Sequence, residues 1–351
     1  METYYRPSRR IAKLHGRWDL RVTVLVTGAQ GFIGRYLVMA LLARGDVVFG
    51  CGRSPRRARH FTHKITRLGV ELVAPLPEAL RPGPQYHYRR LDLSHAGAVA
   101  QAVENIAPTI VYHLAGSLRD APFEQLVSNN IVATRNLCDA LADSGATLVL
   151  GSSGSVYGAV GGDGMPLRES GPAEPIDPYA ATKRTSEDLV RIAMRAGKLD
   201  GRIARIFNVV GPGQEERHVA GRIASQIADL RDRAAEKLAL GPLTAWRDFI
   251  DVRDVAAALI AVGERGMAAT TYNVASGRES RISEILDGLL VAAGAETPAI
   301  EKQPGRAVDI ARQVVDVAAL KALGWHPVHD LPDSLADVMR YYLDLDDARA
   351  G

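Results

Sequence analysis

The sequence predicts an α/β fold, with a Rossmann-type, doubly wound parallel sheet and a smaller, discontinuous C-terminal domain. Short, β-branched apolar runs alternate with segments of helical length, which is typical of a parallel sheet covered on both faces. A glycine-rich stretch, Gly28 to Gly34, joins the first apolar run to the first helical segment. Both observations indicate the same fold class.

The expected elements follow one another along the chain. We expect strands at 21–27, 46–50, 109–113, 147–151 and 202–206, and helices at 32–44, 124–144 and 179–196. Segment 158–178 is rich in Gly and Pro and predicts a loop that could cover a site. Beyond residue 207 the alternation fades. There we expect a helix from Val219 to about Lys237 and one more strand, at 272–275, that returns to the main sheet.

These elements divide the chain into a tail and two domains. Residues 1–20 form an N-terminal tail to which we assign no purpose. Residues 21–208, with about 246–276, form the expected Rossmann domain. Residues 209–245 and 277–345 form the smaller domain, in which we expect most substrate contacts.

Composition narrows the classes of partner. A formal net charge of +3 over 351 residues is too small to indicate nucleic acid or a membrane surface. No apolar run approaches the roughly 20 residues that cross a bilayer. Cys51 and Cys138 have neither metal-ligand spacing nor a disulfide framework, so we expect two buried thiols, no metal and a cytoplasmic protein.

The glycine-rich stretch is the strongest local motif. Its expected cofactor-binding residues are Gly28, Gln30, Gly31, Phe32, Ile33 and Gly34. Glycines here let the chain turn tightly, let a pyrophosphate approach the backbone amides and let the helix pack close to the strand. The alternative is an ordinary strand-to-helix turn, but the strand and helix on either side favour a dinucleotide.

The end of the second strand bears on the choice of nicotinamide cofactor. Gly52 and Arg53 stand where an acid would favour NAD, and Arg53 could instead receive a 2′-phosphate. We therefore favour NADP(H), with NAD(H) possible. Arg56, Arg57 and Arg59 fit a solvated basic loop slightly better than a phosphate contact. Asp92 is expected at the adenine edge, although a turn or helix cap explains it nearly as well.

A catalytic pair is expected on the helix that begins near residue 179. Tyr179 and Lys183 have i, i+4 spacing and share one helix face. A lysine beside a phenol lowers the phenol pKa, so that the hydroxyl can exchange a proton with a substrate oxygen. The pair alone is weak, because the same spacing is common on surface helices.

A serine-rich segment at the end of a predicted strand strengthens this interpretation. Open α/β sheets bind ligands at the carboxyl ends of their strands, where a hydroxyl can hold a substrate oxygen. Ser153 is our candidate over Ser152 and Ser155, and any of the three could instead cap backbone in the loop.

Several motifs together resemble the extended short-chain dehydrogenases/reductases of the nucleotide-sugar epimerase and dehydratase group. They are Gly28 to Gly34, His113 to Gly116, Ser153 to Gly158, Tyr179 to Lys183, Arg205 to Gln214 and Trp246 to Asp254. The last two are similar to substrate-domain motifs, most closely those of the GDP-4-keto-6-deoxy-mannose reductases. The resemblance spans nearly the whole chain after residue 20.

The resemblance implies a role for each matching residue. Ser153 would orient the reacting oxygen, Tyr179 would exchange its proton and Lys183 would also hold the nicotinamide ribose. Leu93, Leu114 and Ala115 are further expected cofactor contacts. Asn208, Arg247 and Arg306 match positions that contact the substrate's diphosphate and nucleotide. For Arg247, a salt bridge with Asp248 or Asp251 explains the residue equally well.

Three functions remain open. The first is an NADPH-dependent reductase of a nucleotide-linked 4-keto-6-deoxy sugar, with Tyr179 as proton donor. The second is a nucleotide-sugar 4-epimerase that retains NAD, and the third is a non-catalytic nucleotide-sensing protein. Gly154 and Ser155 stand where sugar dehydratases carry acids, which disfavours dehydration. The helices at 124–144 and 179–196 resemble those that pair in dimers of the group, so we expect a homodimer.

Overall fold

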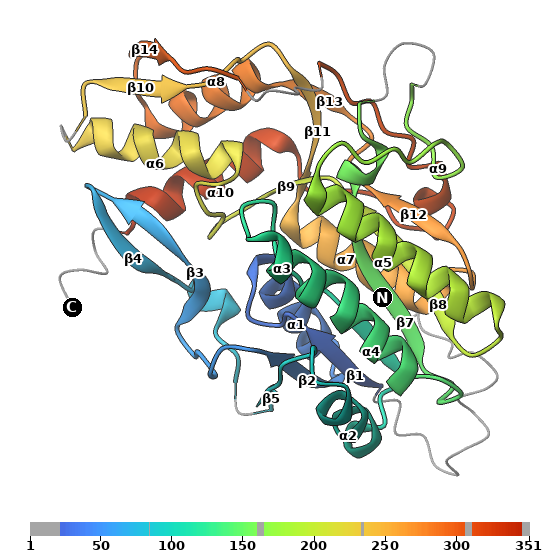
Figure 1. The fold of residues 1–351 in the computed structure, drawn as a ribbon. Coiled ribbons are helices and arrows are strands. Elements are labelled where there is room, and N and C mark those ends of the chain that lie inside the picture. The colour runs from blue at the N-terminus through green and yellow to red at the C-terminus, as the bar shows by residue number, and fades with distance from the viewer. Residues whose placement is uncertain (1–21, 84, 160–164, 233–234, 306–310, 346–351) are drawn as a thin grey trace.

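Seven parallel strands form the central sheet (Figure 1). The computed structural model describes residues 22–83, 85–159, 165–232, 235–305 and 311–345. In spatial order the strands are β12 (Thr271–Val274), β8 (Asp200–Ile206), β7 (Thr147–Ser153), β6 (Ile110–His113), β1 (Thr23–Thr27), β2 (Val47–Gly52) and β5 (His87–Arg90). The strand order reverses at β1, which lies between β2 and β6, and such a reversal is where open α/β sheets bind ligands.

Both faces of the sheet are covered, as the apolar runs predict. Along β1, Val24 and Val26 pack into the core under α1 (Phe32–Ala43) and α7 (Val252–Arg265), whereas Leu25 belongs to the core on the other face. Three helices build that other side: α2 (Ala96–Ile106), α4 (Ala133–Ala140) and α5 (Pro178–Arg195). The doubly wound Rossmann-type fold is therefore confirmed.

Two small sheets and a group of helices lie beyond the main sheet, at the top of Figure 1. One sheet has the order β13 (Glu279–Arg281), β11 (Trp246–Asp251) and β9 (Asn208–Val210), and the other pairs β10 (Lys237–Leu240) with β14 (Ala299–Lys302). Helices α6 (Val219–Arg231), α8 (Ile282–Ala293) and α10 (Leu331–Leu343) pack against one another, and α9 (Ala318–Lys321) lies near β12.

A hairpin that the sequence analysis did not foresee follows β2. It consists of β3 (His60–Arg67) and β4 (Val70–Pro75), followed by the short 3₁₀ helix η2 (Glu78–Leu80). Its apolar face joins the same core as α6, through Phe61 and Ile65. The buried Arg67 forms ion pairs with Asp229 and Asp232 of that region. The hairpin thus connects the first part of the chain to the C-terminal elements.

Most expected helices and strands are present, although some begin or end at other residues than expected. The strand at 272–275 does return to the main sheet, as β12 beside β8. The expected helix from Val219 to about Lys237 is wrong at its C-terminal end, because α6 stops at Arg231 and Lys237 begins β10. The expected helix at 124–144 is α3 (Phe123–Leu126), a π-helical turn η3 (Val127–Val132) and α4, which ends at Ala140.

The described helices include none that is both long and apolar enough to span a membrane. Cys51 and Cys138 are buried and free, as expected from the sequence. Burial raises the pKa of both thiols to about 12, which keeps them protonated and unreactive. The tail at 1–20 lies outside the described residues.

Candidate active site

The glycine-rich turn after β1 has no room for a side chain at Gly28 or Gly34. Gly28 has a φ of +69°, and a Cβ there would lie 2.7 Å from the Ala115 amide nitrogen and 2.8 Å from the Leu114 carbonyl carbon. A Cβ on Gly34 would lie 2.2 Å from the Gly28 carbonyl oxygen. Glycine is therefore required both by the backbone conformation and by the close approach of the turn to α1 and to the end of β6.

The start of α1 fits a bound pyrophosphate. Its N-cap residue, Gly31, makes no side-chain cap hydrogen bond. No capping side chain therefore occupies the amides of the first helical residues, Phe32 and Ile33. Unfilled amides at a helix N-terminus attract anions. Together with the glycine cradle, this start fits a dinucleotide phosphate, and the residues expected to hold it stay a prediction.

Gln30 binds a neighbouring loop within the chain. Its Nε2 donates to the Pro55 carbonyl oxygen at 2.9 Å, and its Oε1 accepts from the Arg57 amide at 2.5 Å. Arg35, which comes one residue after the glycine turn, also donates to Gln30 and to two loop carbonyls. The side chain of Gln30 therefore holds the β2–β3 loop in position.

Asp92 forms a local turn. Its Oδ1 accepts from the Ser94 amide at 2.9 Å and from the Ser94 hydroxyl at 2.8 Å. The Ser94 amide lowers the pKa of Asp92. This is the turn alternative left open by the sequence. The Leu93 side chain is buried in the core beneath, whereas the Asp92 side chain is partly exposed.

Three serines at the end of β7 have separate tasks. Ser152 donates to the buried Glu187 carboxylate at 2.6 Å. The amide and hydroxyl of Ser155 both donate to Ser153 Oγ, at 3.2 and 2.9 Å. With its oxygen already accepting, Ser153 can donate its own proton outward. Ser153 is therefore the serine available to a ligand.

Helix α5 begins at a strong start signal. Asp177 caps it by accepting from the Ala180 amide at 2.8 Å, and Pro178 occupies the first helical position. Tyr179 consequently stands in the first turn, where the positive end of the helix dipole favours a phenolate. Its phenol makes a side-chain hydrogen bond with Ser153. The structure therefore brings the two expected hydroxyl groups together.

The pKa of Tyr179 is set by several neighbours. Burial raises it, whereas the hydrogen bond with Ser153 and the charge of Arg119 lower it. From the sequence we expect Lys183 to lower this pKa, but the Lys183 ammonium instead donates to the Gly151 carbonyl oxygen at 2.5 Å. Burial lowers the pKa of Lys183 to about 8, and the charge of Glu187 opposes this shift.

A buried ion network lies under the catalytic strand and helix. Glu187, one turn beyond Lys183, accepts two hydrogen bonds from Arg205 at 2.9 and 2.8 Å and one from Arg191 at 2.9 Å. The guanidinium of Arg205 lies 4.6 Å from the centre of the Tyr157 ring. Hydrogen bonds from Arg205 and Ser152 keep the pKa of Glu187 low against burial. This network fixes β7 against α5.

Asn130 is a site residue that the sequence analysis missed. It lies in the π turn, accepts from the Ser117 amide at 2.8 Å and donates to Thr182 Oγ1 at 2.9 Å. A Cβ on Gly116 would lie 2.7 Å from Asn130 Oδ1 and 4.0 Å from Lys183 Nζ. Asn130 thus joins the loop after β6 to the catalytic helix. A π turn leaves no periodic signal by which to find it.

Arg119, in the same loop, was also missed. Its guanidinium lies 5.6 Å from the centre of the Tyr179 ring and forms an ion pair of 2.8 Å with Asp177. The neighbouring Asp120 pairs with Arg217, just before α6, at 2.7 Å. The loop therefore connects the catalytic tyrosine to the C-terminal elements. A single exposed arginine in a loop gave no signal in sequence.

The expected substrate residues have different outcomes. Asn208 begins β9 and donates to the Asp248 carbonyl oxygen at 2.9 Å on the neighbouring β11, which also carries Arg247. The Asp248 carboxylate accepts hydrogen bonds from Ser276 and Gly277, and Arg247 donates to the Trp246 carbonyl oxygen at 2.8 Å. Arg306 lies outside the described residues.

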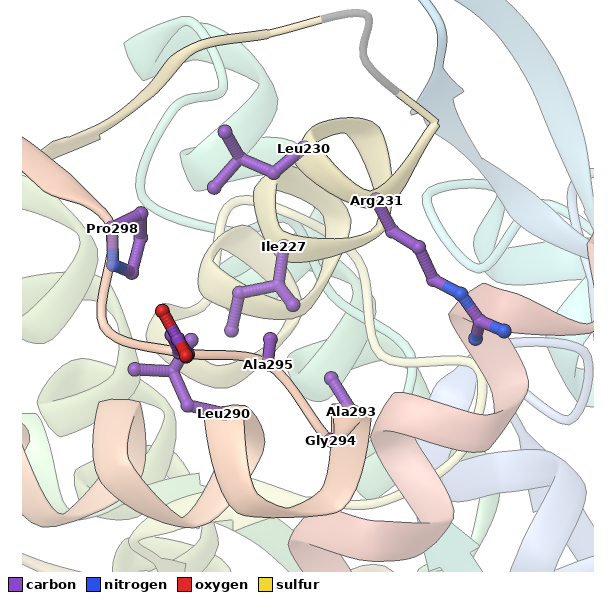
Figure 2. A pocket seen from close by; sticks show the side chains of 9 residues that line it. Ile227, Leu230, Arg231, Leu290, Ala293, Gly294, Ala295 and Pro298 are labelled. Carbon is purple, nitrogen blue, oxygen red and sulfur yellow. The ribbon is translucent and has the colours of Figure 1, made fainter.

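A hollow of about 390 Å³ lies elsewhere, between α6 and α8. Figure 2 shows Ile227 and Leu290 in it, with Pro298 nearby and the Arg231 side chain extending away. None of the residues expected at the active site lines this hollow. It is therefore separate from the chemistry of Ser153, Tyr179 and Lys183.

Comparison with known proteins identifies the group. Residues 24–275 match the model of the NAD dependent epimerase/dehydratase family. The chain is 29% identical over 331 residues to the GDP-6-deoxy-D-mannose reductase of Pseudomonas aeruginosa, covering 90% of this chain and 95% of that protein.

Two solved structures are similar throughout. The UDP-glucose 4-epimerase of Thermus thermophilus, in complex with NAD, has a TM-score of 0.75 and 27% identity, covering 91% of this chain and 98% of that one. RMD from Pseudomonas aeruginosa, complexed with NADPH, has a TM-score of 0.74 and 27% identity, covering 92% and 99%. The two neighbours thus hold different nicotinamide cofactors.

Proposed function

The chain belongs to the NAD dependent epimerase/dehydratase family and is an NAD(P)-dependent enzyme of that type, and from this premise we propose that it reduces a nucleotide-linked 4-keto-6-deoxy sugar with NADPH. The observation that carries the proposal is the contact between Ser153 and Tyr179, with Lys183 one helical turn further on. A hydroxyl and a phenol that meet in this way can hold the same substrate oxygen.

Each catalytic side chain has a task in this proposal. A nicotinamide bound at the glycine turn would supply the hydride. Ser153 donates a hydrogen bond to the keto oxygen and orients it, while Tyr179 delivers the proton to the same oxygen. Lys183 holds a positive charge below its pKa of about 8 and hydrogen-bonds the nicotinamide ribose. Asn208, Arg247 and Arg306 bind the nucleotide diphosphate of the substrate.

The basic loop after β2 supports reduction with NADPH over internal recycling of NAD. Arg53 is exposed at the end of this strand, without a carboxylate ion pair within the described residues. A guanidinium fork suits a 2′-phosphate, for which a permanently bound NAD has no use. The similarity to RMD, whose structure contains NADPH, agrees with this choice.

Turnover of defined substrates tests the proposal. Purified protein is offered a panel of nucleotide-linked 4-keto-6-deoxy sugars with NADPH or NADH, and nicotinamide absorbance is followed. We expect NADPH to be consumed with at least one member and NADH to be a poorer donor. Absence of consumption across the panel would contradict the reductase.

A nucleotide-sugar 4-epimerase is the second candidate, favoured by the similarity to an epimerase that binds NAD. In that case the protein would keep its cofactor through a turnover and return the hydride to the opposite face of the sugar. Stoichiometric NAD that survives gel filtration, with interconversion of C4 epimers and no net absorbance change, would support it.

Domain division and assembly belong to the same proposal. The main sheet would bind the dinucleotide, and the elements around α6, α8 and β11 would bind the nucleotide sugar. We also propose a homodimer that pairs α4 and α5 with their copies. Phe123, Val132 and Ile192 lie exposed on this helical side, and the Ile192 residue is 56% exposed. A monomer by light scattering would refute the dimer.

A further inference from the structure

Four side chains form hydrogen bonds with the backbone of the β2–β3 loop. Tyr88 and Arg90 donate to the carbonyl oxygens of Ser54 and Arg53, each at 2.8 Å. Gln30 holds Pro55 and Arg57, as described above. The loop between 53 and 60 is therefore fixed through its main chain. Of its arginine side chains, Arg56 lies over the Tyr86 ring at 5.8 Å from the ring centre, and Arg53 and Arg59 are exposed.

Arg35 is the deepest part of this arrangement. The residue is 1% exposed, and its Nη2 donates to the carbonyl oxygens of Arg57 at 2.5 Å and His60 at 3.2 Å. Its Nε and Nη1 have no hydrogen-bond partner among the described residues, and the same holds for the hydroxyl of the neighbouring Tyr86. These are three buried donors without an acceptor.

The arginines of this region also lack counter-ions. Within the described ranges, no carboxylate forms an ion pair with Arg35 or with the loop arginines Arg53, Arg56, Arg57 and Arg59, although Arg53 attracts Asp92 through space. A buried charge without a partner is costly, and sites that bind an anion accept that cost. The region is thus built with a positive surplus beside the end of β2.

We propose that Arg35 and Gln30 form a clamp that holds the β2–β3 loop as an anion-binding wall, so that the chain selects a dinucleotide with a phosphomonoester on its adenosine ribose. The proposal rests on the proposed function. It assigns the cofactor preference to Arg35, which supports the loop from below and does not itself contact the phosphate. Arg35 is a positioning residue: it acts through the loop backbone and through its uncompensated charge, while Arg53 faces the ligand.

Adenosine fragments test the clamp without the reaction. Binding of 2′,5′-ADP and of 5′-AMP is measured by calorimetry for the parent and for Arg35→Met. We expect the parent to prefer 2′,5′-ADP at least tenfold. In Arg35→Met the preference falls at least fivefold, with 5′-AMP affinity changed less than twofold, and Arg35→Lys, which keeps the charge but loses the fork, is intermediate. The matched control is Arg195→Gln, which removes an exposed charge at the end of α5.

Other outcomes separate the two proposals. An unchanged preference in Arg35→Met, or an equal loss for both fragments, overturns the clamp. If Arg53→Gln loses the preference while Arg35→Met keeps it, NADPH selection stands and the clamp fails. A parent without preference overturns both. If Arg35→Met does not fold, Gln30→Ala decides, because it frees Pro55 and Arg57 and is expected to lower the preference in the same direction.

Discussion

Two buried arginines support the two halves of the site, and their surroundings differ. Arg205, beneath the catalytic strand, is matched by the fully buried Glu187 through two hydrogen bonds. Arg35, beneath the glycine turn, meets only neutral oxygens in the described chain. The first arrangement has its own counter-ion and leaves only Arg205 Nη1 without a hydrogen-bond partner, whereas the second has no counter-ion and leaves both Nε and Nη1 of Arg35 without one, within the described residues.

The difference indicates what each half is for. A charge-matched ion network makes the carboxyl end of β7 rigid, so Ser153 and Tyr179 hold one geometry. A positive, partly unsatisfied region gains from an incoming anion. The catalytic half is thus organised in advance, and in our proposal the half beneath the glycine turn is organised around a ligand charge.

The largest expected effect concerns the catalytic phenol. Tyr179→Phe removes the proton donor, and turnover should fall by about 10²- to 10⁴-fold, the usual contribution of general acid catalysis. The measurement is kcat with NADPH and a substrate from the panel, alongside cofactor affinity, which should be retained. Tyr341→Phe, which removes a hydroxyl bonded to the distant Pro75 carbonyl oxygen, is the control. Equal turnover of Tyr179→Phe and the parent would remove Tyr179 from the chemistry.

Breaking the matched network should follow in size. Glu187→Gln leaves Arg205 buried without a counter-ion, so the free energy of unfolding should drop by about 3 to 5 kcal/mol in denaturant titration. Glu71→Gln, which breaks the exposed pair with Lys64, is the control and should change it by less than about 1 kcal/mol. Similar changes in the free energy of unfolding for both variants would show that the Glu187–Arg205 network does not stabilise the fold.

Lys183 should give the protein a pH-dependent stability. Its folded-state pKa of about 8 lies below the ordinary 10.5, so the unfolded chain binds the extra proton between these values. Stability should therefore rise through this group from about pH 8 to pH 10.5, by about 3 kcal/mol in total. Denaturant unfolding across this window compares the parent with Lys183→Met. Parallel pH profiles of the two proteins would contradict the shifted lysine.

A smaller effect is expected at the loop over the catalytic tyrosine. Arg119→Gln removes a charge that lowers the pKa of Tyr179, so that pKa should rise. Arg119 is exposed, and a cation–π contact at an exposed site contributes about 0.5 to 1 kcal/mol, which corresponds to a two- to fivefold change in turnover with a shifted pH profile. Arg119→Lys should keep most of the parent profile. Identical pH profiles for Arg119→Gln and the parent would contradict a role of Arg119 in lowering the pKa of Tyr179.

The smallest effect is expected when Arg35, the buried arginine without a counter-ion, is replaced and the free energy of unfolding is measured. Arg35→Met removes a buried charge without a counter-ion, and the relief of desolvation offsets the lost hydrogen bonds. The free energy of unfolding should stay within about 1 kcal/mol of the parent value. If Arg35→Met lowered the free energy of unfolding as much as Glu187→Gln, the contrast between the surroundings of Arg35 and Arg205 would be contradicted.

Local signals were enough to find much of the fold and the reacting groups. Apolar alternation and the glycine turn determined the sheet, because period and backbone freedom are properties of short segments. The i, i+4 spacing put Tyr179 and Lys183 on one face, and the strand end put Ser153 among three candidate serines. The loop after β2 was assigned its basic character but no structure, so the hairpin at 60–75 was missed.

The sequence by itself determined the fold class and the types of side chain at the chemistry. Tertiary structure decided which serine faces the phenol, because Ser152 turns to Glu187 and Ser155 supports Ser153. It also decided that Gln30 and Arg35 hold a loop and that Arg119 lies on Tyr179. The physical reason is that all of these contacts except the local one between Ser155 and Ser153 join residues far apart in the chain, and partners across such distances leave no pattern in a single sequence.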